Sequence, residues 1–207
     1  MNDLYIQFFT IATIHLFAVM SPGPDFTIIL KQSVSHGRKI SIITSLGIGT
    51  GILIHILICM LGLGIIISES KFLFEFIKIL GSIYLLYIGT KFLIQNVQFK
   101  TDENNLFDRT SALKSFSLGF FTNVLNPKAT LFFLSLYATI ITDQTTVIMQ
   151  ALYGLWMSAI TALWFCLLSI MLTNKSVNNK IKKITVIIQK GAGIALIIFA
   201  IKLLFSN

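Results

Sequence analysis

The sequence Ser21-Pro22-Gly23-Pro24-Asp25 interrupts an apolar segment that extends over residues 4–30, and Asn126-Pro127-Lys128 interrupts a second one at 115–141. Proline removes a backbone donor and its ring clashes with the preceding helical turn, so we expect both segments to break there. All three prolines of the chain lie in these two places. The fold therefore depends on what surrounds two broken helices.

The rest of the chain is strongly apolar. Of its 207 residues, 55% are hydrophobic and 12% are charged, and the mean hydropathy is +0.85. Soluble domains carry about 25% charged residues. A helix needs about 20 residues to cross a hydrocarbon core of about 30 Å, and six apolar segments have this length. We place them near residues 4–30, 41–67, 72–94, 115–141, 145–172 and 184–205.

These segments predict an all-α, multi-pass integral membrane protein with a single transmembrane domain over residues 1–207. The first segment is not read as a cleaved signal peptide, because a basic stretch is missing before it. The longest polar connection, about 95–114, separates repeat one (about 1–94) from repeat two (about 115–207). Pro24 and Pro127 are 103 residues apart, which is half the chain length. We therefore expect two inverted three-helix repeats, with transmembrane helices 1 and 4 broken by proline.

Basic residues are unevenly distributed among the connections. Twelve of them follow the first, third and fifth segments: Lys31, Arg38, Lys39, Lys91, Lys100, Arg109, Lys114, Lys175, Lys180, Lys182, Lys183 and Lys190. Three lie on the opposite side: Lys71, Lys78 and Lys202. Cytoplasmic loops are rich in Lys and Arg, so this pattern predicts that both termini lie outside. It also explains the net charge of +8 without a nucleic-acid partner.

A break in hydrocarbon frees backbone groups, and each one costs several kcal/mol unless protein, water or ligand supplies a partner. Pro24 and Pro127 suit the first position of a new half-helix, with Ser21 or Asn126 as a cap in front. The positive ends of the half-helix dipoles would then lie near the membrane midplane and attract carboxylates. The alternative is a pair of plain kinks that allow close packing. The hinge residues are Ser21, Pro22, Gly23, Pro24 and Pro127.

Two charges beside the breaks favour a binding site over plain kinks. Asp25 and Lys128 each cost about 2.5–3.5 kcal/mol to insert, and a kink needs neither. The dipole favours Asp25 in a first turn and disfavours Lys128 there, so Lys128 implies a nearby anion. That anion is either Asp25 itself, in a buried ion pair, or the carboxylate of a substrate whose ammonium group binds Asp25. The second reading describes a zwitterionic amino acid bound by Asp25, Asn126 and Lys128, with Asp25 as the best candidate for a proton carrier.

Other polar or small residues in the segments are interpreted as structural. His15 and His55 are read as hydrogen-bonding residues before proton relays, and Cys59 and Cys166 as small buried hydrophobes. Four glycines are typical of close helix contacts: Gly47, Gly51, Gly81 and Gly89. The sequence contains no nucleotide-binding, zinc-protease or Ser-His-Asp pattern. We therefore expect a protein that is not an enzyme and that has neither a cofactor nor a metal site.

Three motifs together resemble the LysE/RhtB family of bacterial amino-acid exporters. They are Ser21-Pro22-Gly23-Pro24-Asp25, then Gly81-Ser82-Ile83-Tyr84-Leu85 with Gly89, and Asn126-Pro127-Lys128-Ala129. The resemblance covers essentially the whole chain and includes homoserine and threonine exporters. It implies a secondary transporter of the bacterial cytoplasmic (inner) membrane that is driven by the proton motive force. It also implies an amino-acid substrate and a lipid environment, and it is compatible with a homodimer.

Two other classes of function stay open at this point. A related branch of the family handles metal ions, so the alternative is a metal-ion exporter or a passive channel of the same architecture. A membrane-embedded enzyme or assembly factor is a third class, which the missing catalytic motifs disfavour. The sequence does not select the transported compound.

Overall fold

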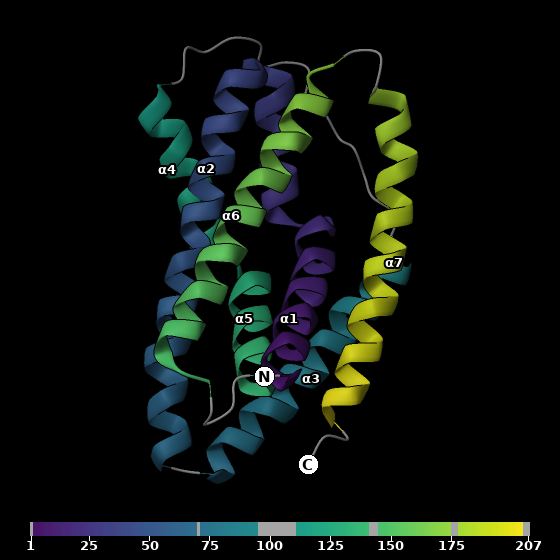
Figure 1. Ribbon diagram of the computed structural model, residues 1–207. Coiled ribbons are helices and arrows are strands. Elements are labelled where there is room, and N and C mark those ends of the chain that lie inside the picture. The colour runs from purple at the N-terminus through teal and green to yellow at the C-terminus, as the bar shows by residue number, and fades with distance from the viewer. Residues whose placement is uncertain (1, 70, 95–110, 141–144, 175–177, 205–207) are drawn as a thin grey trace.

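The computed structural model describes residues 2–69, 71–94, 111–140, 145–174 and 178–204. Within these ranges the protein is all-helical and contains no strand, which confirms the all-α part of the predicted fold class. The helices lie along one long axis (Figure 1). They are α1 (Asn2–Met20), α2 (Pro24–Glu69), α3 (Lys71–Ile94), α4 (Ala112–Val124), α5 (Pro127–Ile140), α6 (Val147–Leu172) and α7 (Asn178–Leu204).

Helix α2 differs from the predicted segments because it is two helices joined at Gly37. Gly37 has φ 77° and ψ −176°, a conformation that only glycine adopts readily. The chain turns back there, and Ser41 Oγ lies 2.7 Å from Ser33 Oγ and 3.3 Å from the Ile29 carbonyl oxygen. The connection expected over residues 31–40 is therefore helical on both sides of one glycine. The buried hydroxyl groups of Ser33 and Ser41 join the two halves of α2.

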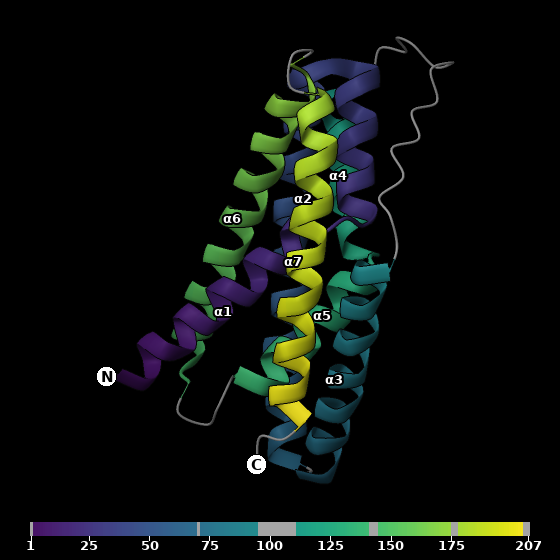
Figure 2. The same cartoon turned by 90° about the vertical axis from the view of Figure 1, so that its right-hand side faces the viewer.

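In two places along the chain, one half-helix follows another along the long axis. Helix α1 leads into the first half of α2, and α4 leads into α5, and each pair changes helix near the middle of the molecule (Figures 1 and 2). The connection at 95–110, which includes Lys100 and Arg109, lies outside the described residues. The six-span count and the inverted repeat stay predictions and are taken up below.

Glycines mark the closest approaches between helices. A methyl group added to Gly47 would overlap the Phe116 carbonyl oxygen of α4, and one added to Gly51 would meet the side chain of Asn123. The other two glycines singled out from the sequence face other helices: Gly81 faces Ser135 of α5, and Gly89 faces Gly193 and Ile197 of α7. Backbones can approach this closely only where a side chain is missing.

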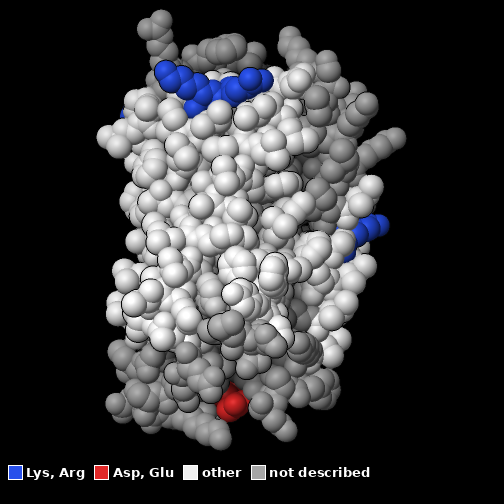
Figure 3. Space-filling view, viewed as in Figure 1, with Lys and Arg blue, Asp and Glu red and all other residues white. Residues whose placement is uncertain are grey.

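The outer surface is apolar along most of its length. Large hydrophobic side chains that are more than half exposed occur on several helices: Leu57, Leu61, Phe72, Leu152 and Leu163. Two helical stretches within the described residues, Pro24–Gly62 and Val147–Leu172, are long and apolar enough to cross a membrane. The exposed Arg38, Lys39 and Lys114 lie at the end where α2 turns back and α4 begins. Figure 3 shows basic side chains gathered at that end, and a middle that is uncharged on this face apart from one basic patch at its right edge.

We predict that Gly47→Ala lowers the melting temperature of the purified protein in detergent. The added methyl group must displace the backbone of α4, and such overpacking costs about 1–3 kcal/mol. Gly62→Ala is the matched control on the same helix, because nothing lies within 4 Å of its added methyl group. Thermal unfolding followed by size-exclusion chromatography measures the difference. A Gly47→Ala protein as stable as the control would contradict the close contact.

Candidate functional site

The first break separates α1 from α2 at residues 21–23. The Ser21 hydroxyl donates to the Ala18 carbonyl at the end of α1, so Ser21 closes the first helix and does not cap the second. The Gly23 carbonyl accepts the first bond of α2, from the Thr27 N–H at 2.9 Å. Pro24 is the first residue of α2, where the N–H that proline lacks is not needed.

The second break separates α4 from α5 at residues 125 and 126. Asn126 caps α5: its Oδ1 accepts from the Lys128 N–H at 3.0 Å, and its carbonyl accepts from the Thr130 N–H at 3.0 Å. Pro127 is the first residue of α5, in the same position as Pro24 in α2. Both new helices therefore begin with a proline.

The Lys128 side chain leaves its own helix and reaches the end of α1. Its Nζ donates to the carbonyl oxygens of Ala18 and Ser21, at 3.3 Å each, and to the Ser21 hydroxyl. It also lies 4.9 Å from the ring centroid of Phe92. A cation is unfavourable at the start of α5 but favourable at the C-terminal end of α1. The anion expected beside Lys128 is thus replaced by carbonyl groups at the end of a neighbouring helix.

Asp25 lies in the first turn of α2 and binds side chains of the second break. Its Oδ2 accepts from Asn123 Nδ2 at 2.9 Å and from Asn126 Nδ2 at 3.3 Å. Its Oδ1 is buried and has no hydrogen-bond partner. Asp25 and Lys128, both described by the structure, form no direct ion pair in this conformation. Two opposite charges therefore lie near one another, and one carboxylate oxygen stays open.

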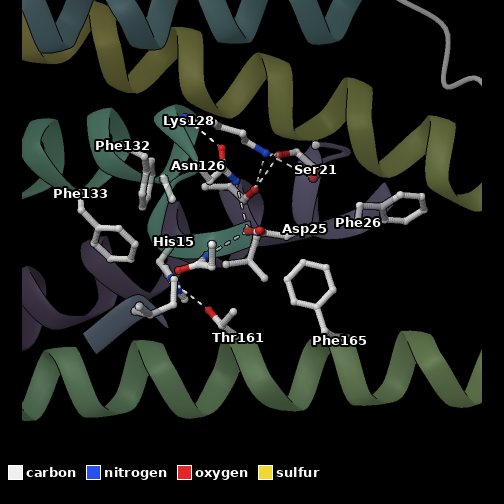
Figure 4. Close-up of a pocket in the computed structure, with 16 residues that line it drawn as sticks. His15, Ser21, Asp25, Phe26, Asn126, Lys128, Phe132, Phe133, Thr161 and Phe165 are labelled. Atoms are coloured by element: carbon white, nitrogen blue, oxygen red, sulfur yellow. Dashed lines mark hydrogen bonds between the residues drawn. The ribbon is translucent and has the colours of Figure 1, made fainter. Parts of the chain in front are cut away.

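Both charges line one pocket between the helix breaks (Figure 4). The pocket has a cavity volume of about 40 Å³, which is room for water molecules. It must widen to reach the roughly 300–1,000 Å³ of small-molecule sites. Its polar lining comes from α1, α2, α4, α5 and α6: His15, Ser21, Asp25, Asn123, Asn126, Lys128 and Thr161. Its aromatic lining consists of Phe26, Phe132, Phe133 and Phe165. Few polar groups thus converge in an otherwise apolar cavity, as is typical of ligand sites.

Asn123 is a site residue that the sequence analysis missed. It is 1% exposed, it donates to Asp25, and its Oδ1 has no partner. His55 supports it from α2: Nε2 lies 3.0 Å from the Asn123 carbonyl oxygen, and the imidazole stacks on Phe133 with centroids 5.7 Å apart. The available signal was the spacing, since Asn123 lies three residues before Asn126 and therefore on the same face of the chain.

The second histidine, His15, lines the pocket itself. Its Nε2 lies 3.2 Å from Thr161 Oγ1, and its Nδ1 is buried without a partner. The sequence analysis read both histidines as hydrogen-bonding residues and did not place either at the site. His15 and Thr161 are 146 residues apart, so only the packing of α1 on α6 brings them together.

Potential metal ligands are scattered through the described residues. No group of three or more His, Cys, Asp or Glu side chains in these ranges could hold a metal ion. Cys59 is buried and Cys166 is partly buried, and both are free thiols.

Comparison with known proteins places this architecture in a family. The model of the LysE type translocator matches residues 16–207. The "Threonine efflux protein" of Salmonella typhimurium is 29% identical over 209 residues, covering 99% of this chain and 100% of the relative. The protein of the same description from Escherichia coli strain K12 is 29% identical over 208 residues, with the same coverage.

An uncharacterized membrane protein of Bacillus subtilis is 30% identical over 196 residues, covering 89% of this chain and 91% of the relative. No solved structure gives a significant match. The family model spans nearly the whole chain, and the two threonine efflux proteins align with it from end to end. The protein is therefore a membrane protein that belongs to the LysE type translocator family, a family of transporters and not of enzymes.

Proposed function

We propose that this protein is a secondary transporter that exports amino acids across the bacterial cytoplasmic membrane, driven by the proton motive force. The observation that carries the proposal is the pocket at the two helix breaks, which Asp25 and Lys128 both line without pairing. Ionisable residues within membrane segments typically mark substrate or ion pathways. The sites of secondary transporters also commonly lie where half-helices end near the midplane.

The free hydrogen-bonding groups of the pocket suit a zwitterion. Asp25 Oδ1 and Asn123 Oδ1 are two buried acceptors without partners, and an ammonium group offers three donors. The start of α5 carries no acidic residue in its first turn, and Lys128 adds a positive charge there. A substrate carboxylate would be attracted to this end of the pocket. Threonine is the first compound to test, because two relatives are described as threonine efflux proteins.

The Lys128 contact provides a way to couple binding to movement. All three N–H donors of the ammonium group have acceptors on Ser21 or Ala18. A substrate carboxylate competes for the same donors, and hydrogen bonds to charged groups contribute about 1.5–3 kcal/mol each. Substrate binding would then release the end of α1 from α5. In this proposal the two broken segments rock against one another around the pocket, as repeats do in alternating access.

Six membrane spans complete the proposal. Helix α1 with the first half of α2 forms span 1, and α4 with α5 forms span 4, so that the proline breaks lie within two spans. The two sets of three spans form an inverted repeat, with the basic connections in the cytoplasm and both termini outside. Asp25 carries the coupling proton on Oδ1, the oxygen that no protein donor occupies.

We predict that Asp25→Asn and Lys128→Met each reduce threonine export from proteoliposomes at least tenfold. The first change removes the charge that would attract the ammonium group, and the second removes the charge that would attract the carboxylate. Lys114→Met, an exposed lysine at the start of α4, is the control and should export at the wild-type rate. Radiolabelled threonine in a counterflow assay measures the rates.

The proposal fails if both pocket variants transport as fast as wild type, or if no member of a panel of amino acids moves. Large unitary currents in planar bilayers would instead indicate a passive channel. Metal efflux without amino-acid efflux would indicate a metal-ion exporter.

Proton coupling has its own test. We expect an inward proton gradient to drive threonine out of proteoliposomes that contain wild-type protein. In vesicles that start at equal pH inside and outside, we expect threonine export to acidify the lumen. A pH-sensitive dye trapped in the vesicles records proton movement. The Asp25→Asn protein should show no coupled signal, because its amide cannot carry the proton. An undiminished dye signal from Asp25→Asn would assign the coupling to another group.

A further inference from the structure

Asp25 and Lys128 would recognise the backbone groups that all amino acids share, so they cannot choose between side chains. A second polar group in the same pocket lies apart from them: His15 on α1 and Thr161 on α6. We propose that His15, held by Thr161, forms a subsite that hydrogen-bonds an uncharged polar side chain of the substrate. This inference rests on the proposed function and adds the class of amino acid that the pocket selects.

The first observation is an unused hydrogen-bonding atom. The His15 side chain is 0% exposed, its Nε2 lies 3.2 Å from Thr161 Oγ1, and its Nδ1 has no partner. Whichever ring nitrogen carries the proton, Nδ1 is a donor or an acceptor without a protein group to meet it. Buried polar atoms normally have partners, so an unpaired one beside a cavity points to a ligand.

The second observation is the surroundings of the imidazole. The rings of Phe132, Phe133 and Trp156 lie with centroids 6.3, 6.0 and 6.0 Å from that of His15. Phenyl rings cannot pair with a ring nitrogen as a hydroxyl or carbonyl does, but they fix the plane of the imidazole. Together with the Thr161 contact, this packing fixes the orientation of an imidazole that lines the pocket.

The third observation is position. His15 precedes the end of α1 by five residues, which places it roughly 8 Å along the helix from the break. In Figure 4, Asp25 lies between the Lys128–Ser21 contact and the His15–Thr161 pair. An amino acid with its carboxylate toward Lys128 and its ammonium group at Asp25 would therefore extend its side chain toward His15. The carboxylate, the ammonium group and the side chain all leave the same carbon atom of an amino acid, so three polar groups around one pocket can each meet one of them.

The subsite favours a neutral hydrogen-bonding side chain. Beyond His15 and Thr161 this side of the pocket is aromatic, with Phe132, Phe133 and Phe165. A charged side chain would lose its hydration there without gaining a counter-charge. A hydrocarbon side chain would leave His15 Nδ1 unpaired, and sites built around such a hydrogen bond discriminate strongly against analogues that lack it. Hydroxyl and carboxamide side chains avoid both penalties.

The test uses pairs of amino acids with the same shape. Threonine and valine differ by one hydroxyl in place of a methyl group, and asparagine and leucine are a second pair. We expect wild-type protein to export the polar member of at least one pair about tenfold faster at equal subsaturating concentration. In Thr161→Val and His15→Phe this ratio should fall toward one, mainly through a higher KM for the polar substrate. Thr161→Ser, which keeps the hydroxyl, should restore the ratio.

Thr50→Val on the exposed face of α2 is the control and should keep the wild-type ratio. The inference is overturned if wild type does not discriminate within either pair, or if the variants lose polar and apolar substrates in proportion. A variant can fail to fold, so two measurements on wild-type protein test the inference independently. They are the ratio of polar to apolar export rates within each pair, and the competition between the two members of each pair for binding. Failure of the proposed function looks different, because Asp25→Asn would then export every substrate at the wild-type rate.

Discussion

A helix that is interrupted inside a membrane must find partners for the backbone groups that the break releases. In this protein the partners are long side chains from other helices. Lys128 of α5 binds the last carbonyl groups of α1, and His55 of α2 lies in hydrogen-bond distance of the Asn123 carbonyl at the end of α4. Lys128 itself lines the pocket, and His55 contacts Asn123, which does. The break and the site thus form one structure.

This arrangement changes the meaning of the two buried charges. A direct Asp25–Lys128 ion pair would stabilise a closed site and leave nothing for a ligand. Instead, Lys128 is held by neutral carbonyl groups and Asp25 by the amides of Asn123 and Asn126. Neutral partners compensate charge only in part, because hydrogen bonds from dipoles replace hydration incompletely. A ligand that brings both a carboxylate and an ammonium group would supply the missing countercharges together.

Local chemistry made part of this structure predictable. Proline at the start of a half-helix and charge beside it are local features, and they drew attention to Asp25, Asn126 and Lys128, three of the residues that line the pocket. Asn123, His55 and the His15–Thr161 pair depend on which helices pack together, which one chain does not reveal. The dipole argument for Lys128 considered only its own helix and missed the end of α1. The connection expected over residues 31–40 is not a polar loop. The chain turns at Gly37 with helix on both sides, and the hydroxyl groups of Ser33 and Ser41 pair across the turn.

The central claim is that the pocket binds a zwitterion through two opposite charges, those of Asp25 and Lys128. Equilibrium binding of threonine, threonine methyl ester and N-acetylthreonine to the purified protein tests it most directly, by isothermal titration calorimetry in nanodiscs. Each modification removes one charge and should weaken binding at least tenfold, and the methyl ester should lose its disadvantage in the Lys128→Met protein. Equal affinity of wild-type protein for all three compounds would contradict the account.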